Sequence, residues 1–313
     1  MTRTAFVFPG QGSQAVGMLA DVAAENQIVG ETFREASDAL GYDLWDLVQT
    51  GPEDKLAQTE FTQPALLTAS IAMWRIARAA DISGVDVVAG HSLGEYSALV
   101  AAGVLDFTDA VKLVRSRGQF MQTAVPLGQG GMAAVLGLSD DQVRNICNEA
   151  SSGSEIVQAA NFNAPGQVVI AGSKAALDTA SEACKAAGAK RVMPLSASAP
   201  FHSALMQPAA DRMGEALAAV QFNAPTMKVI QNVDADYHEA PDAIRENLVR
   251  QMCGAVLWTS TVERLAADGV MRLVECGPGK VLAGLNKRIN KEVETLALGD
   301  VASMTTTLEA LAS

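Results

Sequence analysis

The sequence predicts a mixed α/β protein in which a large domain with a parallel sheet is interrupted by a small inserted domain. Short apolar runs alternate with helix-like segments before residue 126, the order of a parallel sheet covered by helices. The Gly-rich stretch Pro126–Gly131 then marks a boundary. Beyond it, strand-like and helix-like segments follow in a different order, which indicates a second kind of unit.

The first part is expected to begin with a buried strand at Thr4–Phe8, which Pro9-Gly10 ends. The apolar run Val85–Ala89 is a second strand, leading through a turn into a helix-like run that ends near residue 105. Helices are predicted over 13–50, 64–80 and Phe107–Gln122.

The inserted unit reads as strand, helix, strand, strand, helix, strand, the order of a ferredoxin-like fold. The predicted segments are 132–138, 140–150, 156–161, 167–171, 173–187 and 190–195. Later strands at Lys228–Gln231 and Met271–Cys276 would complete the main sheet. We therefore expect a large domain formed by residues 1–126 and 197–313, and a small domain at 127–196.

Composition and charge exclude several classes of protein. Of the 313 residues, 49% are hydrophobic and 19% are charged, an ordinary globular composition. The net charge of −12 argues against nucleic acid and anionic membranes as partners. No signal peptide or membrane span is visible. The cysteines form no C-x-x-C pair and lie near no histidine at metal-ligand spacing, so we expect no metal and a reducing, cytoplasmic location.

The stretch Gly90-His91-Ser92-Leu93-Gly94 carries the most chemical information. A serine between two glycines at a strand-to-helix turn is the pattern of a nucleophile elbow, which makes the large domain α/β-hydrolase-like. The turn leaves little space for side chains at its flanks. The N-terminus of the following helix, with the Leu93 amide, would face an oxyanion formed at Ser92.

A serine nucleophile needs a base, and the chain contains three histidines. His91 adjoins Ser92 and is expected to make a structural hydrogen bond beneath the turn. His238 lies in an acidic segment and is expected at the solvated surface. His202, where the chain re-enters the large domain, is the remaining candidate base, although an ordinary loop histidine is an alternative.

Two further signals have competing interpretations. The loop Gly10-Gln11-Gly12-Ser13-Gln14 can supply an oxyanion donor, begin a dinucleotide-binding turn, or simply form a tight turn. Against the dinucleotide site, Glu31 and Glu35 fall within a helical stretch. The second signal is Arg115-Ser116-Arg117. An arginine here can bind a substrate carboxylate through two parallel hydrogen bonds, or be a surface residue like most helical arginines.

Six motifs, in order along the chain, resemble the malonyl-CoA:acyl-carrier-protein transacylases of fatty acid synthesis. They are Phe8–Gln14, Thr62–Ala65, Gly90–Glu95, Asn161–Gln167, Ala199–Ser203 and Gly277–Gly279. The resemblance spans nearly the whole chain. It implies that Ser92 is the nucleophile, His202 its base, and the amides of Gln11 and Leu93 the oxyanion hole.

By the same resemblance, Arg117 binds the malonyl carboxylate, Gln63 lies near the site, and a backbone carbonyl near Gln251 orients His202. The implied reaction is ping-pong transfer of malonyl from malonyl-CoA to the phosphopantetheine thiol of acyl carrier protein, without a cofactor and by a monomer. Phe201 resembles the malonyl-selecting members. An esterase, a thioesterase and a transferase for another acyl group remain alternatives. The candidates for attracting an acidic carrier are the basic residues Lys185, Lys190, Arg191, Lys287, Arg288 and Lys291, with ordinary solvated charges as the alternative.

Overall fold

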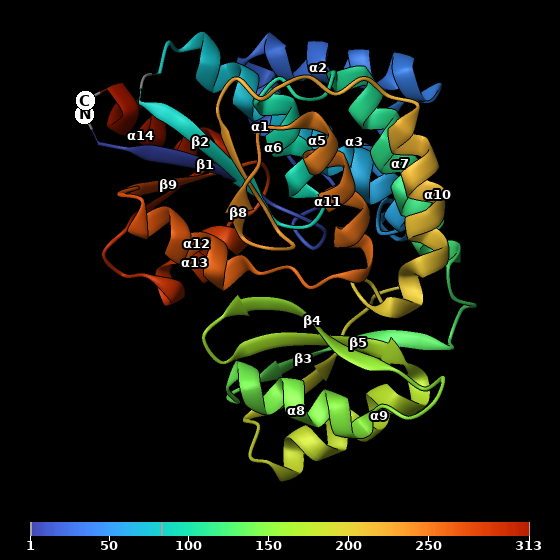
Figure 1. Cartoon of the computed structure of the whole chain (residues 1–313). Coiled ribbons are helices and arrows are strands. Elements are labelled where there is room, and N and C mark those ends of the chain that lie inside the picture. The colour runs from blue at the N-terminus through green and yellow to red at the C-terminus, as the bar shows by residue number, and fades with distance from the viewer. Residues whose placement is uncertain (1, 83, 313) are drawn as a thin grey trace.

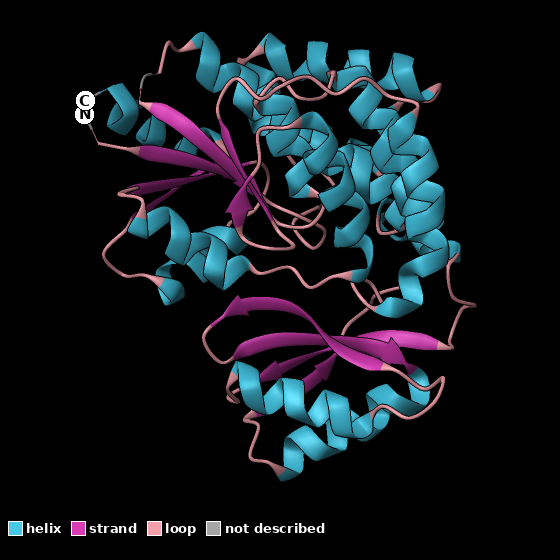
Figure 2. Ribbon diagram, in the orientation of Figure 1, coloured by secondary structure: helices cyan, strands magenta, loops and turns pink. Residues whose placement is uncertain are grey.

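The computed structural model describes residues 2–82 and 84–312, which form two separate β-sheets with their own helices (Figure 1). The larger sheet is flanked by most of the helices, whereas the smaller sheet has two helices on its outer face (Figure 2). The predicted mixed α/β class with a parallel sheet is confirmed.

The larger sheet has six strands in the order β10-β9-β1-β2-β7-β8. The first five run parallel, and the short β8 pairs antiparallel with β7 at one edge. The strands are β1 (Thr4–Phe8), β2 (Val85–Gly90), β7 (Lys228–Gln231), β8 (Asp236–Tyr237), β9 (Arg272–Cys276) and β10 (Glu294–Leu298).

Alternate side chains of β1 supply the two faces of this sheet. Phe6 and Phe8 enter the main core, whereas Ala5 and Val7 pack in a second cluster on the opposite face. The helices of the main core are α1 (Ala20–Glu25), α2 (Gln27–Leu40), α3 (Leu44–Thr50), α4 (Glu53–Leu56), α5 (Thr59–Ala79), α6 (Gly94–Ala101), α7 (Phe107–Thr123), α10 (Gln207–Ala218), α11 (Pro241–Cys253) and α14 (Val301–Ala312). The opposite face is covered by α12 (Trp258–Ala267) and α13 (Val281–Ile289).

The smaller sheet is antiparallel, with its strands in the order β4-β5-β3-β6. Its elements are β3 (Gly130–Leu136), α8 (Asp140–Ala150), β4 (Val157–Ala164), β5 (Gln167–Ser173), α9 (Lys174–Ala186) and β6 (Arg191–Pro194). A third apolar cluster lies between this sheet and its two helices. Backbone hydrogen bonds join β4 to the segment before α12: Phe162 donates to Val256, and Val256 donates to Ala160, both at 2.9 Å.

Two helix predictions need correction. Residues 13–50 contain three helices, and the chain before Ala20 is not helical; Gly41, at φ 78°, ends α2 in the left-handed region that glycine tolerates. The helix predicted from residue 64 begins at Thr59 and carries Pro64 in its interior. A side chain at Gly118 of α7 would collide with backbone at Thr59 and Glu60, so close packing between α5 and α7 accompanies this earlier start.

No helix in the described parts of the chain is both long enough and apolar enough to cross a lipid bilayer.

Candidate active site

Ser92 lies in a sharp turn between the carboxyl end of β2 and the start of α6. Its φ is 52°, a left-handed backbone conformation that costs free energy in a residue other than glycine. A Cβ at Gly90 would collide with the carbonyl of Gly94, and one at Gly94 with the carbonyl of Phe8. The two glycines are therefore required by the closeness of β1, β2 and α6, and the turn holds Ser92 at the sheet edge.

His202 follows β6, immediately before the short 3₁₀ helix Ala204–Met206, and also has left-handed backbone with φ 60°. Its Nε2 is 2.7 Å from Ser92 Oγ, and its Nδ1 is 2.8 Å from the backbone oxygen of Gln251. Because a carbonyl can only accept, Nδ1 carries the proton and donates it, which leaves Nε2 free to accept the Ser92 hydroxyl. The contact with Gln251 thus selects the tautomer that a base requires.

Burial and the nearby charge of Arg117 lower the pKa of His202 to about 3. The imidazole is therefore neutral at physiological pH. A neutral imidazole is the form that takes a proton from serine.

Arg117 enters the same site from α7, and its side chain is completely buried. It donates from Nη1 to Gln63 Oε1 at 2.9 Å and from Nη2 to Gln251 Oε1 at 2.8 Å. Nη2 also lies 3.3 Å from Ser92 Oγ. Arg117 forms no ion pair with any described residue, and its Nε has no hydrogen-bond partner there. Burial lowers its pKa, although the nearby Tyr96 and Glu95 oppose the decrease. The desolvated positive charge beside the serine is therefore not in direct contact with any described carboxylate.

The two expected oxyanion donors lie beside Ser92. Gln11 and Leu93 both line the cavity above the serine, and within residues 2–82 and 84–312 neither backbone N–H has a hydrogen-bond acceptor. The Ser92 N–H, by contrast, is bound to Asn232 Oδ1 at 2.7 Å. Two unpaired amides beside one nucleophile are suited to hold a developing oxyanion.

These groups open into a cavity of about 420 Å³ between the two sheets. Its apolar lining comes from both parts of the chain: Met121, Met132, Val169, Leu195 and Phe201. A cavity of this size, with apolar walls and several polar side chains around the serine, suits a small organic ligand that carries polar groups. Among the described residues, no group of three or more His, Cys, Asp or Glu side chains is placed to hold a metal ion.

The structure also places the two other histidines and the residues considered for a dinucleotide site. His91 Nε2 lies 2.7 Å from Asn163 Oδ1 beneath the elbow, as expected of a structural histidine. His238 was expected at the solvated surface, but it is half-buried against Asp234, with 2.9 Å between Nε2 and Oδ2. A Cβ at Gly10 would meet the His91 carbonyl, so this loop packs on the elbow. Glu31 lies on α2, and β2 ends at Gly90, so the acidic residue of a dinucleotide site is missing.

Sequence reasoning missed Asn232, which follows β7 and binds the elbow backbone. The available signal was its position directly after a strand of the main sheet, because ligand sites of parallel sheets lie beyond the carboxyl ends of their strands. It also missed Glu95, whose side chain is fully buried next to the serine motif.

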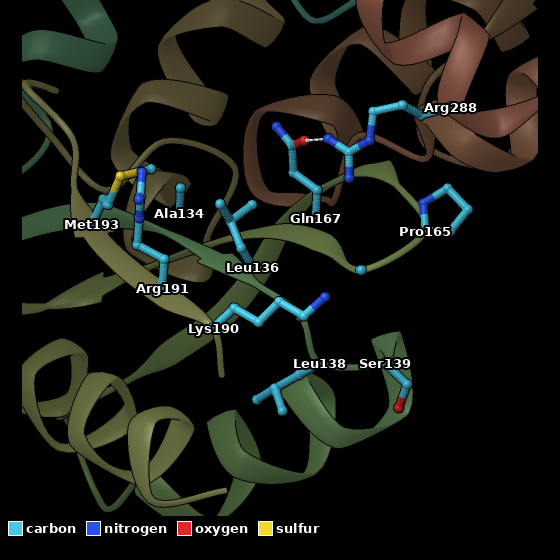
Figure 3. Close-up of a pocket in the computed structure, with 12 residues that line it drawn as sticks. Ala134, Leu136, Leu138, Ser139, Pro165, Gln167, Lys190, Arg191, Met193 and Arg288 are labelled. Carbon is cyan, nitrogen blue, oxygen red and sulfur yellow. Dashed lines mark hydrogen bonds between the residues drawn. The ribbon is translucent and has the colours of Figure 1, made fainter. Parts of the chain in front are cut away.

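A second cavity, of about 730 Å³, lies where the small sheet meets α13. Figure 3 shows that Lys190 and Arg191 reach it from the small-sheet side and Arg288 from α13. Arg288 donates a hydrogen bond to Gln167 across this junction. Three cations around one hollow favour an anionic ligand or surface.

Comparison with known proteins identifies the family to which this chain is similar. Residues 5–305 match the acyl transferase domain family. The chain is 57% identical over 309 residues to the malonyl CoA-acyl carrier protein transacylase of Escherichia coli K12, covering 99% of this chain and all of that protein. It is 42% identical to the Bacillus subtilis protein of the same name, covering 99% and 98% of the two chains.

Two solved structures are closely similar. A crystal structure of an acyl carrier protein S-malonyltransferase from Vibrio cholerae superposes with a TM-score of 0.96 at 55% identity, covering 98% of this chain and all of that one. A malonyl-transacylase in complex with its type II PKS acyl-carrier protein superposes with a TM-score of 0.97 at 52% identity, covering 99% and 100%.

Proposed function

This chain belongs to the acyl transferase domain family, and on that premise we propose that it moves a malonyl group from malonyl-CoA to the phosphopantetheine thiol of an acyl carrier protein, supplying fatty acid synthesis. The family match covers nearly the whole chain, so we propose both half-reactions, acylation of the serine and transfer to the carrier, for this protein. The relatives named above carry this activity in their names.

In the proposed mechanism, His202 Nε2 takes the Ser92 proton while Oγ attacks the thioester carbonyl. The amides of Gln11 and Leu93 hold the oxyanion, a contribution of about 3 kcal/mol for each donor. His202 then protonates the departing CoA thiolate, and a malonyl-serine ester remains. The carrier thiol gives its proton to His202 as its sulfur attacks this ester. When the intermediate collapses, the bond from the acyl carbon to Ser92 Oγ breaks and His202 returns the proton to Oγ.

The observation that carries the malonyl assignment is the buried, charge-unpaired Arg117 beside Ser92. In the free protein its guanidinium is held by the neutral amide oxygens of Gln63 and Gln251. An acyl group with a terminal carboxylate can form the direct ion pair that Arg117 lacks, whereas an acetyl group cannot. A hydrolase needs no such cation, and the Nδ1 partner of His202 is a carbonyl where most serine hydrolases place a carboxylate.

The proposed reaction is tested by following both half-reactions separately. Release of CoA measures acylation by malonyl-CoA, and malonyl-carrier formation measures transfer to purified holo acyl carrier protein. We expect both with malonyl-CoA and little acylation with acetyl-CoA. Rapid release of free malonate without a carrier would identify a thioesterase instead.

We further propose that residues 1–126 and 197–313 form an α/β-hydrolase-like catalytic domain and that 127–196 form a ferredoxin-like domain. The strand order β4-β5-β3-β6 and the two helices on one face support the second assignment. His202 follows directly on the return from the small domain, so relative movement of the domains would change the catalytic geometry. We expect a cytoplasmic monomer, which light scattering of the purified protein tests.

The basic cavity of Lys190, Arg191 and Arg288 is the proposed contact for the acidic carrier. Of the other basic candidates, Lys185 is paired with Glu182 on α9. Charge reversal of Lys190 and Arg288 should slow transfer to the carrier while acylation by malonyl-CoA stays unchanged. Lys112→Glu, an exposed lysine on α7, is the matched control. Equal losses in both half-reactions would rule out this docking surface.

A further inference from the structure

Glu95 is a fully buried carboxylate at the second position of α6, directly below the Ser92 turn. Its Oε2 accepts the backbone N–H of Asn232 at 2.7 Å, and its Oε1 accepts from Gln231 Nε2 at 3.0 Å. No described basic side chain forms an ion pair with it. A buried carboxylate is costly, so this one requires an explanation beyond packing.

The first partner of Glu95 leads to the nucleophile. The Asn232 side chain accepts the Ser92 N–H at 2.7 Å and donates to the Gly90 carbonyl at 2.6 Å. These two bonds clamp the strained backbone on both sides of the elbow. Because Glu95 binds the backbone of Asn232, it holds the Asn232 side chain in the position that makes these two bonds.

Gln251 connects the same clamp to the other two functional groups. Its Nε2 donates to the Ser92 carbonyl at 3.1 Å and lies 3.3 Å from Asn232 Oδ1. Its Oε1 accepts from Arg117, and its backbone oxygen accepts from His202, both at 2.8 Å. One buried network therefore joins the Glu95 carboxylate to the serine, the arginine and the histidine.

The network favours the ionised form of Glu95. Both of the hydrogen bonds to its carboxyl oxygens come from N–H donors, and a carboxylate accepts such bonds more strongly than a neutral carboxyl group does. Burial raises the pKa of Glu95 to about 7, although its hydrogen bonds and Arg117 oppose the increase. Arg117 of α7 is the charged group that acts on it, and Tyr96 is the other ionisable neighbour. The described parts of β1, β2, α5 and β7, which also pack on α6, add no further charge at this carboxyl.

We propose that Glu95 is a positioning residue whose ionised carboxylate holds Asn232, and with it Gln251, in the arrangement that aligns Ser92, Arg117 and His202 for acyl transfer. This inference rests on the proposed function. It has a specific consequence for the pH profile. His202 has a pKa of about 3 and does not titrate near neutrality, so we expect protonation of Glu95 to lower the activity as pH falls through about 7.

The test is the rate of malonyl-serine formation with Glu95→Gln, followed by intact mass from about pH 5.5 to about pH 8.5. The wild-type rate should rise with pH and level off above about 7. Residues that orient reacting groups from behind change activity by about 10- to 100-fold in metal sites, and we expect a loss of this size at high pH. The remaining rate of Glu95→Gln should be independent of pH. Glu95→Asp keeps the charge and should retain the pH-dependent step at an intermediate rate.

Glu275→Gln is the matched control. Glu275 is another fully buried carboxylate, on β9, and it accepts backbone N–H groups of Leu282 and Ala283 at the start of α13. Its loss should lower stability while the folded protein keeps the wild-type rate and pH profile. This control separates removal of a buried carboxylate in general from removal of the elbow network.

Two results would overturn the proposal: a wild-type rate in Glu95→Gln, or a slower rate that keeps the same pH-dependent step. If Glu95→Gln does not fold, infrared difference spectra of the wild type replace it. A carboxylic-acid carbonyl band should disappear as pH rises through about 7, in step with the gain in rate; its absence contradicts the proposal. Failure of wild-type protein to form a malonyl adduct at any pH would instead refute the proposed function.

Discussion

Replacement of Arg117 by alanine should remove the preference for malonyl over acetyl groups. A malonyl carboxylate can form two charge-assisted hydrogen bonds with the guanidinium, each worth about 1.5–3 kcal/mol. In the free protein Arg117 has no carboxylate partner among the described residues, so the first of these bonds replaces no ion pair. A second bond, to Nη1 or Nη2, replaces one to an amide oxygen of Gln63 or Gln251. The loss of transition-state stabilisation on removal of Arg117 should therefore be near the lower limit for two such bonds, about 3–4 kcal/mol, which corresponds to about 10²- to 10³-fold in kcat/KM.

The assay is release of CoA from malonyl-CoA and from acetyl-CoA, with kcat/KM measured for each. The malonyl value should fall by this factor, whereas the acetyl value should stay within about tenfold of wild type because acetyl has no charge to bind. Arg115→Ala is the control, since Arg115 lies two residues earlier on α7 and donates to the Leu40 carbonyl, away from the cavity. An unchanged ratio of malonyl to acetyl activity in Arg117→Ala would refute the assignment of Arg117 to the carboxylate.

Three further predictions concern the elbow and its base. His202→Ala should slow acylation by about 10²- to 10⁴-fold because no other described imidazole contacts Ser92; a loss below tenfold would contradict its role as base. The free energy of unfolding should also depend on this residue. The pKa of His202 is about 3 in the native protein but 6.5 when unperturbed. Between about pH 3 and pH 6.5, therefore, the histidine binds a proton in the unfolded state but not in the native state. Relative to His202→Gln, the wild type should therefore lose about 1.4 kcal/mol of unfolding free energy per pH unit as pH falls below about 6.5, and parallel urea-derived curves would contradict this. Gly94→Ala should destabilise the protein by at least about 2 kcal/mol because the new methyl group would collide with the Phe8 carbonyl. Gly30→Ala is the control: it lies in an open position on α2 and should stabilise the protein by about 0.5–1 kcal/mol. Equal effects of the two substitutions in denaturant titrations would show that the elbow is not tightly packed.

Local signals were sufficient for much of the fold. β1 matches its predicted range, and β2 extends one residue past the apolar run, to Gly90, since both strands are apolar and end at turn residues. All six elements between Gly130 and Pro194 were expected, because strand and helix periods alternate clearly there. The edge strand β10 was missed because its side chains are mostly half-buried, so its pattern is not that of a core strand. The start of α5 was misplaced because tertiary packing at Gly118 overrides the local signal of Pro64.

The candidate site was predicted where chemistry lies in a local motif. Ser92 and Leu93 belong to the elbow, whereas His202 was one of three candidates until the family resemblance selected it. Carboxylate binding by Arg117 was one of two interpretations until the resemblance selected it, and the roles of Gln63 and Gln251 came only from the resemblance. The convergence of these residues depends on packing between α5, α7 and α11, which a local pattern does not show. Asn232 and Glu95 were missed for a different reason. Their function lies in hydrogen bonds between segments that are distant in sequence: Glu95 and Asn232 are 137 residues apart. The position of Asn232 after a strand could have marked it as a site residue, but the sequence pattern does not show which groups it binds.

The most direct test of the central claim is intact-mass spectrometry after the protein is mixed with malonyl-CoA in the absence of a carrier. The wild type should gain the mass of one malonyl group, and peptide mapping should place it on Ser92. Ser92→Ala should gain none. A malonyl adduct that persists in Ser92→Ala, or that maps to another residue in the wild type, would contradict a mechanism built on this serine.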